Sequence, residues 1–262
     1  MKPHRIAAVV VRHGYEARRN LDRITDAIYW PIMDIVVWGF LAIYLARGGQ
    51  MKPGLVSLLL GAAILWGMFR AFQRDMAVGF LAELWTRNLV NLFSTPLTVA
   101  EYITGLIIVN LLKALIGMTA AALIAWFCYS YNIFPALLGL APFIFNLMAF
   151  AIAVGAIITG LIFRYSTRIQ GLTWSLTGLL MPLSCVFYPV KALPRFLRPP
   201  AQLLPTTQSF EGMRQALSGG GFSHQDFAWG LALNAIYLIG AILFFRTMFE
   251  SARARGLLVK IE

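Results

Sequence analysis

The sequence predicts an all-α integral membrane protein with six transmembrane helices in a single transmembrane domain, residues 1–262. Of the 262 residues, 59% are hydrophobic and only 13% are charged. Soluble domains carry about 25% charged residues, so a soluble core could not hide this much apolar surface, whereas a bilayer can. Six segments are also long enough to cross about 30 Å of hydrocarbon at roughly 1.5 Å per helical residue. These predicted spans are residues 27–46, 53–69, 102–127, 137–163, 169–188 and 227–245.

The distribution of Lys and Arg predicts that both chain ends face the cytoplasm. With six spans, 15 of these residues fall on the cytoplasmic side, six of them within the first 26 positions, and six fall outside. This bias follows the positive-inside rule, although Arg47 and Lys52 flank the first external turn. We therefore attribute the net charge of +11 to basic residues at the helix ends, beside the membrane surface, and expect no nucleic-acid partner.

Residues 4–24 are predicted to form an amphipathic helix that lies in the plane of the membrane surface. Apolar residues recur at helical spacing from Ile6 onward, and arginines occupy much of the other face. A solvated charged tail is the alternative. The only apolar run in this part, residues 7–11, is too short for the core of a signal peptide, so no cleavage is expected.

A second amphipathic helix, on the cytoplasmic side, is predicted over residues 76–92. Leu81 and Trp85 fall on its apolar side, whereas Glu83 precedes Arg87 by four residues on the polar side, which is the favourable order for an ion pair. The sequence Thr95-Pro96 then marks a break. Thr98-x-x-Glu101 matches a capping box that opens the third span.

The segment 189–220 is predicted to form short external helices that dip back into the outer leaflet. Five prolines between positions 189 and 205 divide it into pieces, and three consecutive glycines at 219–221 end the last one. Its apolar residues are too many for a solvated loop. Backbone that re-enters the membrane must be covered by protein or line a cavity, so this segment is expected to cap something.

Two charged residues, Asp34 and Lys113, fall inside the predicted spans. Placing each of them at mid-bilayer costs about 2.5–3.5 kcal/mol on insertion scales, so each is expected to have a structural or functional role that offsets this cost. The two side chains could pair with each other, or one could face a substrate path. Alternatively, Asp34 lies near the interface, and Lys113 snorkels or faces another helix.

The sequence lacks the motifs of an enzyme. There is no G-x-x-x-x-G-K-S/T sequence to cradle ATP phosphates and no H-E-x-x-H or G-x-S-x-G. The three histidines lie outside the spans without evident partners for a metal, and Cys128 and Cys185 do not form a C-x-x-C pair. We expect a non-catalytic chain that holds no cofactor or metal.

Two motifs in register resemble the ABC type-2 permease family, the exporter subunits of bacterial drug, lipid-linked glycan and polysaccharide systems. The first is Val186-Phe187-Tyr188-Pro189-Val190-Lys191-Ala192-Leu193-Pro194, followed by Gly212-Met213-Arg214. The second is Leu92-Phe93-Ser94-Thr95-Pro96-Leu97 with Glu101. The resemblance covers essentially the whole chain. Two places depart from the family pattern: Leu204-Pro205 stands where Asn-Pro is frequent, and Trp85-Thr86-Arg87 stands where Gly-Thr or Gly-Ser is frequent.

The resemblance implies a permease in the bacterial cytoplasmic (inner) membrane that pairs with a second copy of itself or with a paralogous permease. Each permease would dock on a separate ABC ATPase subunit, which binds the ATP. Residues 76–92 would be the coupling helix, with Leu81, Glu83, Trp85 and Arg87 as its contact residues. The segment 189–220 would form the external gate. Its candidate residues are Tyr188, Pro189, Pro194, Pro205, Gly212 and Arg214.

The scarcity of charge in the spans favours an amphipathic or hydrophobic substrate, such as a drug, a lipid or a lipid-linked glycan. The competing prediction is a secondary transporter or channel that works without ATP and uses Asp34 and Lys113.

Overall fold

The computed structural model describes residues 1–48 and 53–254, and every regular element in these ranges is a helix. Five helices are long and apolar enough to cross a membrane, which confirms an all-α membrane protein. Three residues that entered the charge count, Lys52, Arg255 and Lys260, lie outside the described residues. The five long helices are α2 (Leu21–Arg47), α3 (Pro53–Trp85), α5 (Val99–Tyr129), α6 (Leu137–Tyr165) and α10 (His224–Ala254).

The predicted fifth span, residues 169–188, is not one long helix. Its helical part, α7 (Leu172–Leu183), has 12 residues. At 1.5 Å per residue it is about 18 Å long, which is shorter than the hydrocarbon layer. The helix ends there because Cys185 turns into the left-handed region, with φ of 50°. A sixth continuous span is therefore not confirmed.

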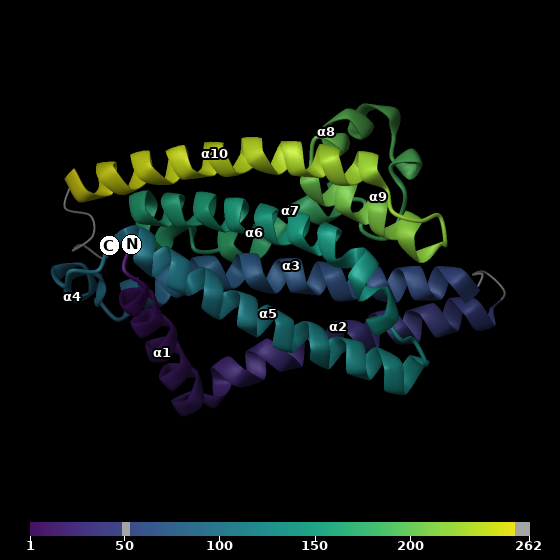
Figure 1. Cartoon of the computed structure of the whole chain (residues 1–262), viewed down its shortest axis with the longest axis horizontal. Coiled ribbons are helices and arrows are strands. Elements are labelled where there is room, and N and C mark those ends of the chain that lie inside the picture. The colour runs from purple at the N-terminus through teal and green to yellow at the C-terminus, as the bar shows by residue number, and fades with distance from the viewer. Residues whose placement is uncertain (49–52, 255–262) are drawn as a thin grey trace.

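The chain nevertheless returns across the bundle between α6 and α10. These two helices run in the same direction, because Phe143 near the start of α6 packs on Phe227 near the start of α10, and Phe163 near the end of α6 packs on Phe249. Residues 166–223 must therefore lead back from one end of the bundle to the other. As a result, the start of α1 and the end of α10 lie at the same end (Figure 1).

Helix α3 forms the centre of the bundle, where it packs against α2, α5 and α6. Its buried aromatic residues pack on those of α6: the rings of Phe69 and Phe150 stack with centroids 5.9 Å apart, and those of Phe80 and Phe163 meet edge to face at 5.3 Å. With 33 residues it is about 50 Å long, so it extends well past the hydrocarbon layer.

The length of α3 corrects the prediction for residues 76–92. The sequence indicated a span that ended at Phe69 and a separate helix after it, whereas the structure continues one helix to Trp85. The charged residues between the two parts do not break the helix, because they have ionic partners on α2 and α5. Only a short helix, α4 (Leu89–Ser94), follows.

The first helix, α1 (Pro3–Arg19), is shorter than the predicted 4–24 and ends where Asn20 becomes extended. It crosses α5, and its Val9 is buried against that helix. Gly105 of α5 makes this close approach possible, since a Cβ atom there would lie 2.6 Å from Cγ1 of Val9. The inner face of α1 is therefore packed on protein.

The segment between α7 and α10 contains the short helices that were predicted. They are two 3₁₀ turns (Val190–Ala192 and Arg195–Leu197), α8 (Arg198–Gln202) and α9 (Pro205–Leu217). The glycines end α9 as expected, with φ of 81° at Gly219 and 75° at Gly221. In Figure 1 this segment lies at the end of the bundle away from α1. Its depth in the membrane stays a prediction.

Replacement of Gly105 by Ala should loosen α1 from the bundle. The added methyl group would meet the Cβ and Cγ1 atoms of Val9, and overpacking of this kind costs about 1–3 kcal/mol. We expect a lower midpoint of thermal unfolding in detergent and faster proteolysis within α1. Gly240→Ala, in an open position of α10, is the matched control and should cause no loss. Equal behaviour of the two variants would contradict the packing described here.

Candidate functional site

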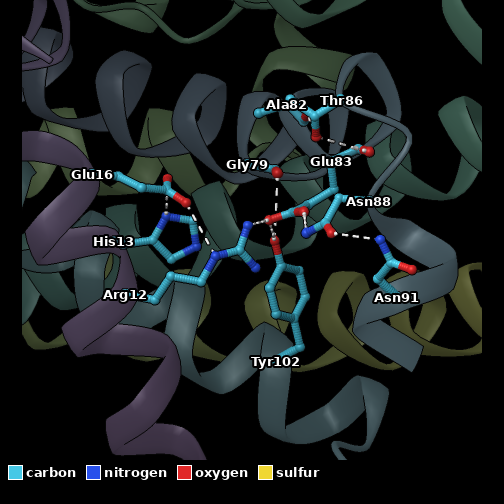
Figure 2. A network of polar contacts seen from close by, with 10 residues as sticks. All are labelled: Arg12, His13, Glu16, Gly79, Ala82, Glu83, Thr86, Asn88, Asn91 and Tyr102. Carbon is cyan, nitrogen blue, oxygen red and sulfur yellow. Dashed lines mark hydrogen bonds and ion pairs between the residues drawn. The ribbon is translucent and has the colours of Figure 1, made fainter. Parts of the chain in front are cut away.

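A buried carboxylate joins α1 to the end of α3 (Figure 2). Glu83 lies on the last turn of α3, and its side chain is only 3% exposed. It accepts hydrogen bonds from Nη2 of Arg12 at 2.6 Å, from Nδ2 of Asn88 at 2.7 Å and from Oη of Tyr102 at 3.3 Å. Residues from α1, α3, α5 and the turn before α4 therefore meet at one carboxylate.

The α1 side of this network has an acidic residue of its own. Glu16 accepts from Nε of Arg12 at 3.1 Å and lies 3.4 Å from Nδ1 of His13, which is itself buried. Arg12 thus lies between Glu16 and Glu83 and has a carboxylate on each side (Figure 2). Charge-assisted hydrogen bonds are about twice as strong as neutral ones, so this arrangement fixes the position of α1 relative to α3.

A second carboxylate, Glu101, holds the beginning of α1 to the beginning of α5. The predicted capping box with Thr98 is confirmed: the Glu101 amide donates to Oγ1 of Thr98 at 3.2 Å, and the Thr98 amide donates to Oε2 of Glu101 at 3.0 Å. Glu101 also accepts from the Lys2 amide at 2.7 Å and lies 3.5 Å from Nη1 of Arg5. The beginning and the middle of α1 are therefore tied to the bundle by ionic contacts, through Arg5 and Arg12.

The four predicted contact residues of the coupling helix separate into two groups. Leu81 is completely buried and Glu83 nearly so, and both face the bundle rather than the surface. Trp85 is 50% exposed, and Arg87 is exposed in a left-handed turn with φ of 54°. The interpretation of Leu81 and Glu83 as surface contacts is wrong, because tertiary packing covers the side of the helix that was taken as open.

The two predicted intramembrane charges do not pair with each other. Asp34 of α2 accepts from Nη2 of Arg70, and Nζ of Lys113 on α5 lies 3.5 Å from Oδ2 of Asp75. Both partners lie on α3. Sequence reasoning missed them because it assigned that part of the chain to a cytoplasmic loop, where charged residues are ordinary.

Arg74, also on α3, completes this ionic cluster. Its Nη2 atom lies 2.8 Å from Oδ2 of Asp26 and 3.1 Å from Oδ1 of Asp75. The cluster therefore pairs each positive group with a neighbouring carboxylate, which lowers the cost of holding charges between helices. We define the ionic cluster of α3 as Asp26, Asp34, Arg70, Arg74, Asp75 and Lys113.

A cavity of about 530 Å³ lies between α2, α3 and α7, beside the ionic cluster. One part of its lining is charged, with Arg70, Arg74, Asp26 and Asp75. The rest includes three tryptophans and two threonines, so the cavity offers both ionic and flat apolar surface to a ligand. These residues are Trp30, Trp85, Trp174, Thr173 and Thr177.

The predicted gate residues meet in the segment that follows α7. Arg214 donates from Nη1 to the carbonyl oxygens of Cys185 at 2.8 Å and Val186 at 3.2 Å, and its Nη2 atom lies 3.0 Å from Oε1 of Glu211. Oε1 of Glu211 in turn accepts from the amide of Val190 at 2.7 Å. Arg214 therefore holds the turn that ends α7 against α9.

The other predicted gate residues differ in how closely they join this unit. The Tyr188 hydroxyl donates to the Pro182 carbonyl at 2.6 Å. Pro205 is buried at the first turn of α9, and Gly212 faces Phe143 so closely that a Cβ atom would lie 2.1 Å from its ring. Pro189 and Pro194 are exposed at the surface. Whether these residues form a gate stays a prediction.

No group of three or more His, Cys, Asp or Glu side chains that could hold a metal ion occurs within residues 1–48 and 53–254.

Comparison with known protein families gives a match over most of the chain. A family model described as ABC-2 type transporter matches residues 17–218, which extend from the last turn of α1 to the end of α9. No curated protein matches the chain.

Replacement of Arg12 by Gln should destabilise the protein, because it leaves the buried Glu83 carboxylate without its cation. Breaking a buried ion pair costs about 3 kcal/mol or more, and the low end applies here since Arg12 is 37% exposed. Thermal unfolding of the purified protein measures the loss. Arg18→Gln, at an exposed position of the same helix, should stay within about 0.5 kcal/mol.

A second substitution distinguishes the ion pair from a general effect on α1. Glu83→Gln in the Arg12→Gln background removes both charges and should recover part of the lost stability. If the loss of stability in the double variant equals the sum of the losses in Arg12→Gln and Glu83→Gln, the ion pair does not carry the stabilisation.

Proposed function

Since the chain belongs to the ABC-2 type transporter family, and is thus the membrane-spanning permease component of an ABC transporter, we propose that it is an exporter subunit driven by a separate ATPase chain. The proposed substrate is amphipathic or hydrophobic: a drug, a lipid or a lipid-linked glycan. The proposed location is a bacterial inner membrane, with both ends of the chain in the cytoplasm.

The observation that carries the proposal is the exposed end of α3. Trp85 and Arg87 present an aromatic ring and a cation at the surface, at the end of a helix that continues without a break through the centre of the bundle. A helix or turn that inserts into a groove of a partner needs an apolar anchor with charged flanks. A push on this end would therefore move the whole of α3 and, through Glu83 and Arg12, α1 as well.

The cavity beside the ionic cluster supports the proposed class of substrate. Its tryptophans can hold an apolar or flat group, and its arginines and carboxylates can hold a polar or charged one. A substrate with both kinds of group fits this lining better than a purely polar solute does.

The exposed side of α2 is where we place the proposed pairing with a second copy or a paralogous permease. Large apolar side chains remain exposed along this helix, and a second subunit is one surface that could cover them. They include Tyr29, Trp30, Val37, Phe40 and Tyr44.

The alternative function, a transporter or channel that works without ATP, would use Asp34 and Lys113. Both side chains are already paired with charges of α3, so in this alternative the pairs would have to open during transport. Recovery of the tagged chain from gently solubilised membranes tests the two functions. An ABC ATPase at about one copy per permease supports the exporter. Recovery of the chain alone in several detergents would favour the alternative.

Replacement of Trp85 by Ala should weaken the ATPase contact by about tenfold or more, because truncation of a central aromatic anchor has effects of this size. Recovery of the ATPase subunit with the permease measures the effect, because Trp85 also lines the proposed substrate cavity and substrate stimulation would not separate the two roles. Arg87→Glu should act in the same direction. Trp126→Ala is the matched control, since Trp126 is 48% exposed at the opposite end of the bundle. Undiminished ATPase recovery with Trp85→Ala would remove Trp85 from the contact.

Cysteine labelling tests the proposed orientation. Cys128 is exposed at the end of α5 that would face outward, so a membrane-impermeant maleimide should label it from that side. Cys185 is completely buried, so the reagent cannot reach its thiol. Cys128→Ser should therefore abolish labelling. Labelling of Cys128 only after the membrane is opened would reverse the proposed orientation.

A further inference from the structure

An apolar groove of about 400 Å³ lies on the side of the bundle formed by α5, α6 and α10. In Figure 1, α10 and α5 lie on either side of α6. Ile103 and Ile107 of α5 form one wall, Ile242 and Phe245 of α10 form the other, and small residues of α6 form the floor. The groove exists because the side chains of Ala153 and Ala156 are short and do not fill the space between α5 and α10.

The surroundings of the groove indicate that lipid is what can enter it. Both walls belong to helices long and apolar enough to cross the membrane, so the groove opens toward hydrocarbon. On α10 it extends from Leu238 to Glu250, which is about 18 Å at 1.5 Å per residue. This length is close to the depth of one leaflet, about 15 Å, so an acyl chain can lie along it.

One end of the groove carries two opposite charges. Arg246 and Glu250 both line it and are exposed, one helical turn apart on α10. Positions four residues apart lie about 5–6 Å from each other on one helix face. In the described part of the chain neither of them forms an ion pair, with each other or with another residue. The order Arg before Glu is also the less favourable one for pairing along a helix.

We propose that this groove binds one phospholipid with an amine-bearing zwitterionic headgroup of the ethanolamine type. The acyl chain fills the apolar groove, Arg246 binds the phosphate, and Glu250 accepts hydrogen bonds from the ammonium group. Arginine suits phosphate because its planar donors match the phosphate oxygens.

The carboxylate selects among headgroups. A glycerol headgroup leaves the lipid with a net negative charge and gives Glu250 no cation to bind. A choline headgroup carries a cation but has no N–H to donate to the carboxylate. The binding needs neither an ATPase nor transport, so it does not depend on the proposed function.

Native mass spectrometry of the purified full-length chain can measure this binding. The probes are ethanolamine, choline and glycerol phospholipids with identical acyl chains. We expect the ethanolamine lipid to bind about threefold more tightly than the glycerol lipid, which is the size of effect that one partly exposed charge contact gives. Equal or tighter binding of the glycerol lipid would overturn the proposal.

Two substitutions test the headgroup contacts. Glu250→Gln should remove the preference for ethanolamine, and Arg246→Gln should weaken binding of all three lipids. Glu250 and Arg246 are exposed, so both variants should fold. Arg253→Gln, an exposed arginine outside the groove lining, is the matched control and should bind lipids as the original chain does. A preference for ethanolamine that survives Glu250→Gln would contradict the assignment.

A third substitution tests the acyl chain site. Ala156→Leu should fill the floor and weaken binding of every lipid, whereas Ala235→Leu, on an exposed part of α10 outside the groove, should not. The same spectra report the number of protein chains. If Ala156→Leu leaves lipid binding unchanged but breaks a dimer, a second copy of the chain occupies the groove and the proposal is wrong.

Discussion

Helix α3 carries charged residues through the centre of the bundle, and each of these charges must be neutralised by a neighbouring helix. Asp34 and Asp26 of α2 approach Arg70 and Arg74, and Lys113 of α5 approaches Asp75. An unpaired charge between helices would cost several kcal/mol, so α2 and α5 have to lie where their charges meet those of α3. The positions of three spans therefore depend on one set of ion pairs.

The same constraint continues past the hydrocarbon layer. Glu83 is buried on the last turn of α3, and the cation that neutralises it is Arg12 of α1. This contact turns a surface helix into a structural part of the bundle and leaves Trp85, two residues further, at the surface. The exposed end of α3 is thus held from two sides by α1 and by Tyr102 of α5. An element of this kind can pass a displacement to the spans, because it cannot move independently of them.

The parts of the fold that could be predicted from the sequence depend on neighbouring residues. A long apolar run indicates a span wherever its partners lie, Thr98 and Glu101 are three residues apart in their capping box, and the glycines that end α9 adopt positive φ locally. The parts that were wrong depend on distant residues. From the sequence, Arg70 indicated the end of a span, whereas in the structure Asp34 of another helix neutralises it and α3 continues. Glu83 was predicted at the surface, because the sequence does not show that Arg12 lies against it.

Two of the hollows described above meet at α3. Asp75 lines the cavity between α2, α3 and α7, and the next residue, Met76, lines the groove between α5, α6 and α10. Successive residues on a helix point about 100° apart, so one helix can present a charged face to one hollow and an apolar face to the other. A shift of α3 that moves Asp75 in the cavity would therefore also move Met76 beside the groove. A lipid bound in the groove would oppose or favour that shift according to how well it fits each position of α3, which is the only way a ligand can bias a conformational equilibrium.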